Sequence, residues 1–110
     1  MEIIKTSIEG LVIIQPKVFE DDRGYFMESY KDCFIKENFP GIHFVQDNES
    51  KSSYGVLRGL HFQKPPFEQT KLVRVVEGKV LDVAVDLRTG STTFGKWESI
   101  ILSGSNKKQF

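Results

Sequence analysis

Short stretches in which apolar and polar residues alternate, separated by turn residues, run along most of the chain. The clearest alternation lies in residues 79–88, where every second residue falls on one mostly apolar face: Lys79, Leu81, Val83, Val85 and Leu87. Because successive side chains of a strand point to opposite faces of a sheet, this pattern predicts a β-strand. A series of such runs is typical of an antiparallel sandwich or barrel.

Shorter runs of the same kind predict further strands, at residues 11–18, 25–29, 43–50, 55–63, 70–77 and 96–103. The tight connection Glu77-Gly78-Lys79 predicts a hairpin between two of these runs. One helix is expected over residues 30–39, because apolar residues recur there at helical spacing and Pro40-Gly41 ends the pattern.

Together these elements predict an all-β domain over residues 1–110, a jelly roll or β-sandwich with one short helix and a cavity lined by side chains. Up to eight short strands are few for a closed roll, and the chain stops at Phe110 with no closing element. We therefore expect a roll that is incomplete at its C-terminus, either truncated or completed by another chain.

Composition narrows the partners of this domain. Lys and Arg total 15, as do Asp and Glu, so no basic field predicts binding to nucleic acid or to a membrane surface. A single cysteine, Cys33, excludes an internal disulfide framework. The first residues lack the pattern of a signal peptide, and no run approaches the roughly 20 apolar residues of a membrane span. We expect a cytoplasmic protein.

His61 is the first candidate for chemistry, because an imidazole exchanges a proton near neutral pH. For an isolated histidine, a core residue that only hydrogen-bonds to the backbone is the better interpretation. Arg58 and Lys71 on either side favour a general base that acts on an anionic substrate. In a regular strand Arg58 and His61 face opposite sides, so we expect a bulge at Gly59 that turns both toward one cavity.

Lys71 alternates in register with Val73, and an ammonium on that face could stabilise an enolate or hold a phosphate. A lysine at a strand end that reaches solvent is an equal alternative. Asp82 and Asp86 share the less apolar face of the neighbouring run and are candidate partners of Lys71 or His61, although a solvated strand face explains them as well.

A further set of side chains suits substrate binding. Arg23 lies in a turn, and its guanidinium suits a diphosphate, although a charged turn needs no ligand. Phe26 and Glu28 share a strand face that could hold a nucleobase or sugar hydroxyls, with a core phenylalanine as the alternative.

Polar side chains also alternate along residues 43–50, where Gln46 and Asn48 share a face and Asp47 lies opposite. Aligned amides suit recognition of a sugar or a base. Amides that bond within a strand ladder or a turn give the same sequence pattern.

Neither a metal nor a cofactor is expected. His43 and His61 are the only histidines, and they form no His-x-His pair and have no obvious carboxylate ligand nearby. The sequence contains no glycine-rich phosphate loop or dinucleotide fingerprint. Trp97 is expected in the core rather than on a nucleic-acid surface, because no basic stripe accompanies it.

Several blocks of sequence, taken in order, resemble the dTDP-4-dehydrorhamnose 3,5-epimerase family. They cover nearly the whole chain, at residues 19–28, 44–48, 55–63, 71–75, 82–88, 94–97 and 102–103. Each block alone is modest, whereas the ordered series is highly specific.

The resemblance implies a cupin-like jelly roll that works as a homodimer, without a metal, on a dTDP-4-keto-6-deoxyhexose on the route to dTDP-rhamnose. By matching position, His61 is the base that removes protons next to the 4-keto group, and Lys71 stabilises the resulting enolate oxygen and contacts the substrate. Further positions match substrate contacts, part of them in the partner subunit's site: Arg23, Phe26, Glu28, Gln46, Asp47, Asn48 and Arg58.

The chain departs from the family pattern where members continue beyond residue 110, through a segment with a tyrosine acid and a carboxylate that orients the base. Tyr25, Tyr30 and Tyr54 do not match that tyrosine's motif. We therefore expect little complete epimerisation from these 110 residues alone. A single-carbon epimerase or ketoisomerase of the family, a non-catalytic sugar-nucleotide binding module and a metal-dependent cupin oxygenase stay open as alternatives.

Overall fold

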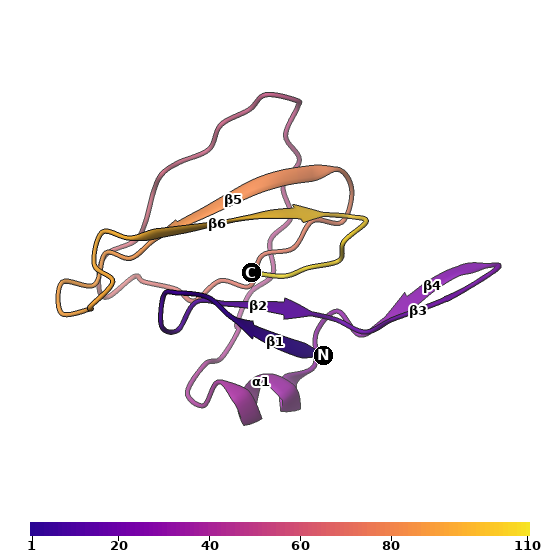
Figure 1. Cartoon of the computed structure of the whole chain (residues 1–110), viewed down its shortest axis with the longest axis horizontal. Coiled ribbons are helices and arrows are strands. Elements are labelled where there is room, and N and C mark those ends of the chain that lie inside the picture. Colours follow the sequence, from indigo (N-terminus) through magenta and orange to yellow (C-terminus); the bar gives the residue numbers. More distant parts are fainter. The chain divides into compact units, whose positions relative to one another are not determined.

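Three two-stranded antiparallel ribbons and one short helix make up the regular structure of the chain (Figure 1). The computed structural model describes residues 1–110. The chain divides into two compact units, one formed by Met1–Lys31 with Leu72–Phe110 and the other by the continuous segment Asp32–Lys71. All strands belong to the first unit, which is therefore the β framework, and the helix belongs to the second.

The first ribbon pairs β1 (Glu2–Lys5) with β2 (Val12–Gln15). The turn between them is held by Thr6, whose hydroxyl accepts a bond from the Ile8 N–H at 3.1 Å and lies 2.8 Å from the Leu11 carbonyl. The Ile8 side chain is buried, so the turn is closed by both polar and apolar contacts.

The last two residues of the chain extend this ribbon. Gln109 and Ile14 exchange both backbone hydrogen bonds at 2.9 Å, and Gln109 also pairs with Arg74. Phe110 exchanges both backbone bonds with Val73, at 2.8 and 2.9 Å. Residues 109–110 therefore lie between β2 and residues 73–74, where Gln109 is almost completely buried.

A hairpin joins β3 (Val18–Asp21) to β4 (Gly24–Met27) and extends away from the other two ribbons (Figure 1). The strand expected over residues 11–18 is interrupted at Pro16, which has no N–H to donate to a ladder, so β2 and β3 are separate strands. Phe19 lies opposite Phe26, and both rings are more than half exposed.

The longest ribbon pairs β5 (Lys79–Val85) with β6 (Trp97–Ser103). Its register places Val80 opposite Leu102, and opposed residues in an antiparallel pair share a face. Leu102 is fully buried, so the face of the ribbon that it shares with Val80 is the packed one. This is the less apolar face of β5, whose aspartates had suggested a solvated surface. The opposite face, which includes Leu81, is largely exposed.

The hairpin expected around Glu77-Gly78-Lys79 is wrong. β5 pairs with β6, and residues 70–77 form no strand beyond the single bridge at Arg74. A glycine turn between two β-rich runs is a local signal, whereas strand pairing depends on which segment the fold brings alongside.

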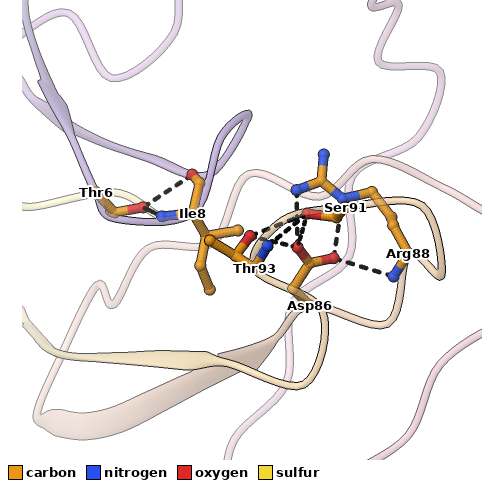
Figure 2. Close-up of polar contacts among 6 residues, drawn as sticks. All are labelled: Thr6, Ile8, Asp86, Arg88, Ser91 and Thr93. Carbon is orange, nitrogen blue, oxygen red and sulfur yellow. Dashed lines mark hydrogen bonds and ion pairs between the residues drawn. The ribbon is translucent and has the colours of Figure 1, made fainter.

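Asp86, directly after β5, organises the turn that returns the chain to β6 (Figure 2). Its buried carboxylate accepts bonds from Arg88 Nε at 2.9 Å, Ser91 Oγ at 2.6 Å and Thr93 Oγ1 at 2.6 Å. Arg88 first, and then the two hydroxyls, hold the pKa of Asp86 far below its usual range. Asp86 is thus a structural residue of this turn.

Glu98 on β6 makes a second group of hydrogen bonds in the β framework. One of its carboxylate oxygens accepts bonds from both the hydroxyl of Ser7, at 2.5 Å, and the Ser7 N–H, at 3.0 Å. These bonds lower the pKa of Glu98 and connect the β1–β2 turn to the β5–β6 ribbon.

The Asp32–Lys71 unit begins with helix α1 (Asp32–Asn38), shorter than the expected helix over residues 30–39. Asp32 in the first turn pairs with Lys36 one turn later at 2.5 Å, and Ile35 is the buried residue of the helix. Gly41, with φ of 88°, takes the left-handed conformation just after the helix. Seven residues are too few to cross a bilayer, and no helix of the structure is long and apolar enough to do so.

The strands expected over residues 43–50 and 55–63 are absent. Backbone bonds in this segment are local, such as Phe67 N–H to the Lys64 carbonyl at 2.9 Å. Every residue from 45 to 71 is exposed, although large apolar side chains such as Leu57 and Phe67 occur among them. An alternating pattern becomes a strand only when a second strand pairs with it, and no segment does so here.

Candidate functional site

His61 lies in an irregular loop over residues 55–63. The strand expected there is absent, so the bulge proposed at Gly59 is wrong as well. Gly59 nevertheless shapes the loop, because it has a φ of 103° and a Cβ on it would lie 3.1 Å from His61 Nδ1. A side chain at position 59 would therefore crowd the imidazole in addition to straining the backbone, and glycine avoids both.

Arg58, three residues before His61, is folded back onto its own segment. Its Nε donates to Ser52 Oγ at 2.9 Å, and its Nη2 lies 3.5 Å from the Lys51 carbonyl. These bonds orient the guanidinium and leave Nη1 available for an anion. The residue is exposed, as its interpretation as an anion-binding residue requires.

Lys71 is the last residue of the Asp32–Lys71 unit, and its side chain is exposed. The strand expected over residues 70–77 is absent, so the register argument that placed Lys71 on the face of Val73 does not apply. What holds the chain here is Val73, which is bonded to Phe110. Lys71 thus lies two residues before a fixed backbone position.

Gln46, Asp47 and Asn48 belong to the same unit and are exposed. Because this segment is not a strand, the expected sharing of a face by Gln46 and Asn48 does not hold. Gln46 lines an open hollow of about 410 Å³, together with residues 41–45 and 68–70. The polar residues Glu68, Gln69 and Thr70 on its other side were not singled out from the sequence, where their only signal is a polar triplet after Pro65-Pro66 and Phe67.

Arg23 and Phe26 lie on the β3–β4 hairpin of the β framework, where residues 19–21 and 23–26 line an open hollow of about 330 Å³. The Arg23 guanidinium is paired with Asp21, whose Oδ2 lies 2.5 Å from Nη2. This pairing raises the pKa of Arg23 and lowers the pKa of Asp21. The charged-turn interpretation of Arg23 is therefore correct for its contacts in this structure.

Glu28 follows β4 and lies outside the strand, so it does not share a strand face with Phe26 as expected. Its carboxylate pairs with Lys31 at 3.5 Å, and both side chains are about half exposed. An exposed pair of this kind is weak, so Glu28 can exchange its partner at little cost.

The nine candidate residues thus divide between the two units. Arg23, Phe26 and Glu28 belong to the β framework, and the other six belong to the Asp32–Lys71 unit: Gln46, Asp47, Asn48, Arg58, His61 and Lys71. No group of three or more His, Cys, Asp or Glu side chains is arranged to hold a metal ion. A reaction that needs no metal stays a prediction.

Comparisons with known proteins identify the family of this chain. The family model described as dTDP-4-dehydrorhamnose 3,5-epimerase matches residues 5–110. A dTDP-4-dehydrorhamnose 3,5-epimerase of Methanothermobacter thermautotrophicus is 53% identical over 107 residues, which are 97% of this chain and 57% of that protein. This chain therefore spans a little more than half the length of that relative.

Solved structures extend the match to the fold. The dTDP-4-dehydrorhamnose 3,5-epimerase of Elizabethkingia anophelis is 56% identical, with a TM-score of 0.91 over 100% of this chain and 61% of its own. A dTDP-6-deoxy-D-glucose-3,5-epimerase of Legionella pneumophila, solved in complex with dTDP-4-keto-L-rhamnose, is 52% identical with a TM-score of 0.92 over 98% of this chain and 57% of its own.

These similarities confirm the expected fold class, a mostly β, cupin-like jelly roll with one short helix. The ordered sequence blocks, the match over residues 5–110 and the structural similarity all lead to the same assignment. The chain belongs to the dTDP-4-dehydrorhamnose 3,5-epimerase family.

Proposed function

We propose that this chain supplies the proton-abstracting and nucleotide-binding part of an epimerase that acts on a dTDP-4-keto-6-deoxyhexose in dTDP-rhamnose biosynthesis. The observation that carries the proposal is the match, over 98% of this chain, to an epimerase solved with dTDP-4-keto-L-rhamnose. The chain spans about three fifths of such relatives, so the activity of the whole enzyme belongs to the proposal.

In this proposal His61 removes the proton from C3 or C5, the two carbons beside the 4-keto group. The electron pair of the broken C–H bond forms a C=C bond, and the carbonyl oxygen becomes an enolate oxygen. Lys71 stabilises that negative charge, because a placed cation lowers the energy of a developing oxyanion. Return of a proton from the opposite face inverts the carbon and requires an acid besides His61.

The position of His61 supports its role as the base. A histidine that serves only the core is buried, whereas His61 is exposed in a loop where a substrate can reach it. Gly59 leaves space for the imidazole, and Arg58 and Lys71 supply positive charge within the same unit. This combination suits a base that acts on an anionic substrate.

The remaining candidates are proposed to bind the nucleotide sugar. Arg23 and Arg58 suit the diphosphate, since a guanidinium can donate two parallel bonds to phosphate oxygens. Phe26 offers an exposed ring for stacking on a base. The polar contacts to the sugar and the base are assigned to Glu28, Gln46, Asp47 and Asn48.

We further propose that the protein is cytoplasmic and acts as a homodimer built from single jelly-roll domains, with no cofactor, nucleic acid or membrane partner. The free thiol of the exposed Cys33 is compatible with a reducing compartment. The exposed ring of Phe19 is apolar surface that a second subunit can cover.

Deuterium exchange tests the reaction. The chain is incubated with the dTDP-4-keto-6-deoxyhexose in heavy water, and NMR follows deuterium at C3 and C5 against the same sugar without protein. Exchange at both carbons with little inversion is the expected result. Exchange at one carbon identifies a single-carbon enzyme of the family, and binding without exchange identifies a binding module. Absence of both exchange and binding would contradict the proposal.

A further inference from the structure

Lys107 is the one residue other than glycine with a positive φ, at 56°. This left-handed region is uncommon for a lysine, since its Cβ crowds the backbone, and glycine is the residue that adopts it without strain. A residue whose surroundings hold its backbone in such a conformation is a candidate for a specific role.

The turn around Lys107 is fixed on both sides. Asn106 Oδ1 accepts bonds from the N–H groups of Ser103 and Lys108, both at 3.1 Å. The Asn106 amide donates to the Ile101 carbonyl at 2.8 Å, and the Gln15 amide donates to the Asn106 carbonyl at 3.2 Å. The backbone conformation of Lys107 is therefore imposed by its neighbours.

That side chain meets the β3–β4 hairpin. Lys107 Nζ lies 3.9 Å from the centroid of the Tyr25 ring, well within the range of a cation–π contact. Tyr25 lies opposite Glu20, and Phe26 lies opposite Phe19, so Tyr25 is on the hairpin face that does not carry the two phenylalanines.

The other face of the hairpin has a weaker contact of the same kind. Lys17 Nζ lies 5.0 Å from the centroid of the Phe19 ring. The hairpin consists of two strands of four residues, and an isolated ribbon of this size is marginal in water. Its orientation therefore depends on the few side chains that contact it, of which Lys107 makes the closer contact.

We propose that Lys107 is a positioning residue, which holds the β3–β4 hairpin through Tyr25 and thereby presents Arg23 and Phe26 to the nucleotide sugar. The inference rests on the proposed function, in which Arg23 and Phe26 bind the substrate. Lys107 itself does not touch the reacting atoms. It acts by limiting the orientations of the strand pair that carries the binding residues.

The test compares Lys107→Gly, Lys107→Gln and Lys107→Arg with the matched control Lys108→Gln. Lys107→Gly removes both the backbone strain at position 107 and the ammonium. If only the backbone conformation at this position mattered, the hairpin of this variant would be at least as well ordered as in the parent chain. Amide hydrogen exchange of residues 18–27 reports opening of the hairpin without any ligand. Titration with dTDP then reports whether the hairpin is part of the nucleotide site.

Loss of a surface cation–π contact is expected to raise hairpin exchange by about two- to fivefold in the Gly and Gln variants, and to weaken dTDP binding by a similar factor. Arginine, which also stacks on aromatic rings, is expected to restore both, and Lys108→Gln is expected to change neither.

Unchanged exchange in the Gly and Gln variants would overturn the proposal, whatever happens to binding. Faster exchange with unaltered dTDP affinity would overturn the positioning role as well, since the hairpin would then move without consequence for the nucleotide. If the parent chain binds no dTDP, the proposed function fails by itself, and hairpin exchange still decides whether Lys107 holds the hairpin.

Discussion

The β framework and the Asp32–Lys71 unit differ in how their residues are bonded. In the framework, strands pair along their whole length and buried polar groups such as Asp86 and Gln109 have bonding partners. In the other unit, one helix is followed by a long stretch with local turns only, exposed from residue 45 to residue 71. The framework therefore carries most of the buried core, and the second unit carries exposed side chains, among them six of the nine candidate residues.

This contrast predicts that stability and the proposed chemistry depend on different regions of the chain. The residues proposed for proton abstraction, His61 and Lys71, both belong to the exposed segment, as is common for functional residues on loops supported by a rigid scaffold. Substitutions in the two regions should therefore have different consequences, with loss of chemistry in one and loss of stability in the other. Four predictions test that separation, from the largest expected effect to the smallest.

His61→Gln should lower the rate of deuterium exchange at C3 and C5 by ~10²–10⁴-fold, the usual contribution of a general base. Because His61 is exposed, the unfolding midpoint should stay unchanged. The matched control is His43→Gln, which changes the other histidine of the same unit and should retain exchange. Equal loss in both variants would show that the effect does not come from a base at position 61.

Leu102→Ala should lower the free energy of unfolding by ~2–5 kcal/mol, because the side chain is fully buried in the β framework and its removal leaves a cavity. Leu57→Ala, at a leucine 89% exposed in the other unit, should change stability by no more than about 0.5 kcal/mol. Urea unfolding of both variants measures the contrast. Similar losses would mean that the exposed segment packs in solution.

Gly59→Ala should reduce deuterium exchange by up to ~100-fold, since a methyl 3.1 Å from His61 Nδ1 displaces the imidazole and small displacements of a base are costly. Gly55→Ala provides the control. Gly55 also has a positive φ, 81°, but a Cβ there meets nothing within 4 Å, so both variants share the backbone strain. A comparable loss in the two would attribute the effect to strain rather than to crowding of His61.

Acidification should destabilise the β framework through Asp86. Because its pKa is lowered in the folded state, protons bind more readily to the unfolded chain, where the value is about 3.8. The contribution is complete above about pH 4 and is lost progressively as the pH falls below that value. Asp86→Asn should lower the urea midpoint at pH 7 and flatten its decline between pH 5 and pH 2, whereas Asp22→Asn should do neither. A parallel decline in all three proteins would contradict this role.

Much of the β framework was predictable from local patterns. The alternation in residues 79–88 and 96–103 identified β5 and β6 to within a few residues, and the strand expected over residues 25–29 overlaps β4, whereas β3 was not expected as a strand of its own. The same reasoning placed strands over residues 43–50 and 55–63, where none exists. An alternating pattern shows which side chains suit the two faces of a strand. It does not show whether a second strand lies alongside to pair with it.

The candidate site divides in the same way. Residue type and order alone led to the proposals for His61, Arg58 and Lys71, which stay predictions, and the ordered blocks led to the family that the comparisons established. The sequence could not show that the Asp86 carboxylate holds the turn after β5, because this use depends on Ser91 and Thr93 folding back over it.

The sequence by itself therefore determined the family, the β character of the chain and the chemical groups available to it, since these follow from residue identity and order. The three-dimensional fold was needed to show which face of β5 is packed, how Gln109 is buried between β2 and Arg74, and how closely a side chain at position 59 would approach His61. The first two depend on atoms from separate segments meeting in space, and the third depends on the backbone conformation of the loop that carries both residues. No pattern of alternating side chains contains that information.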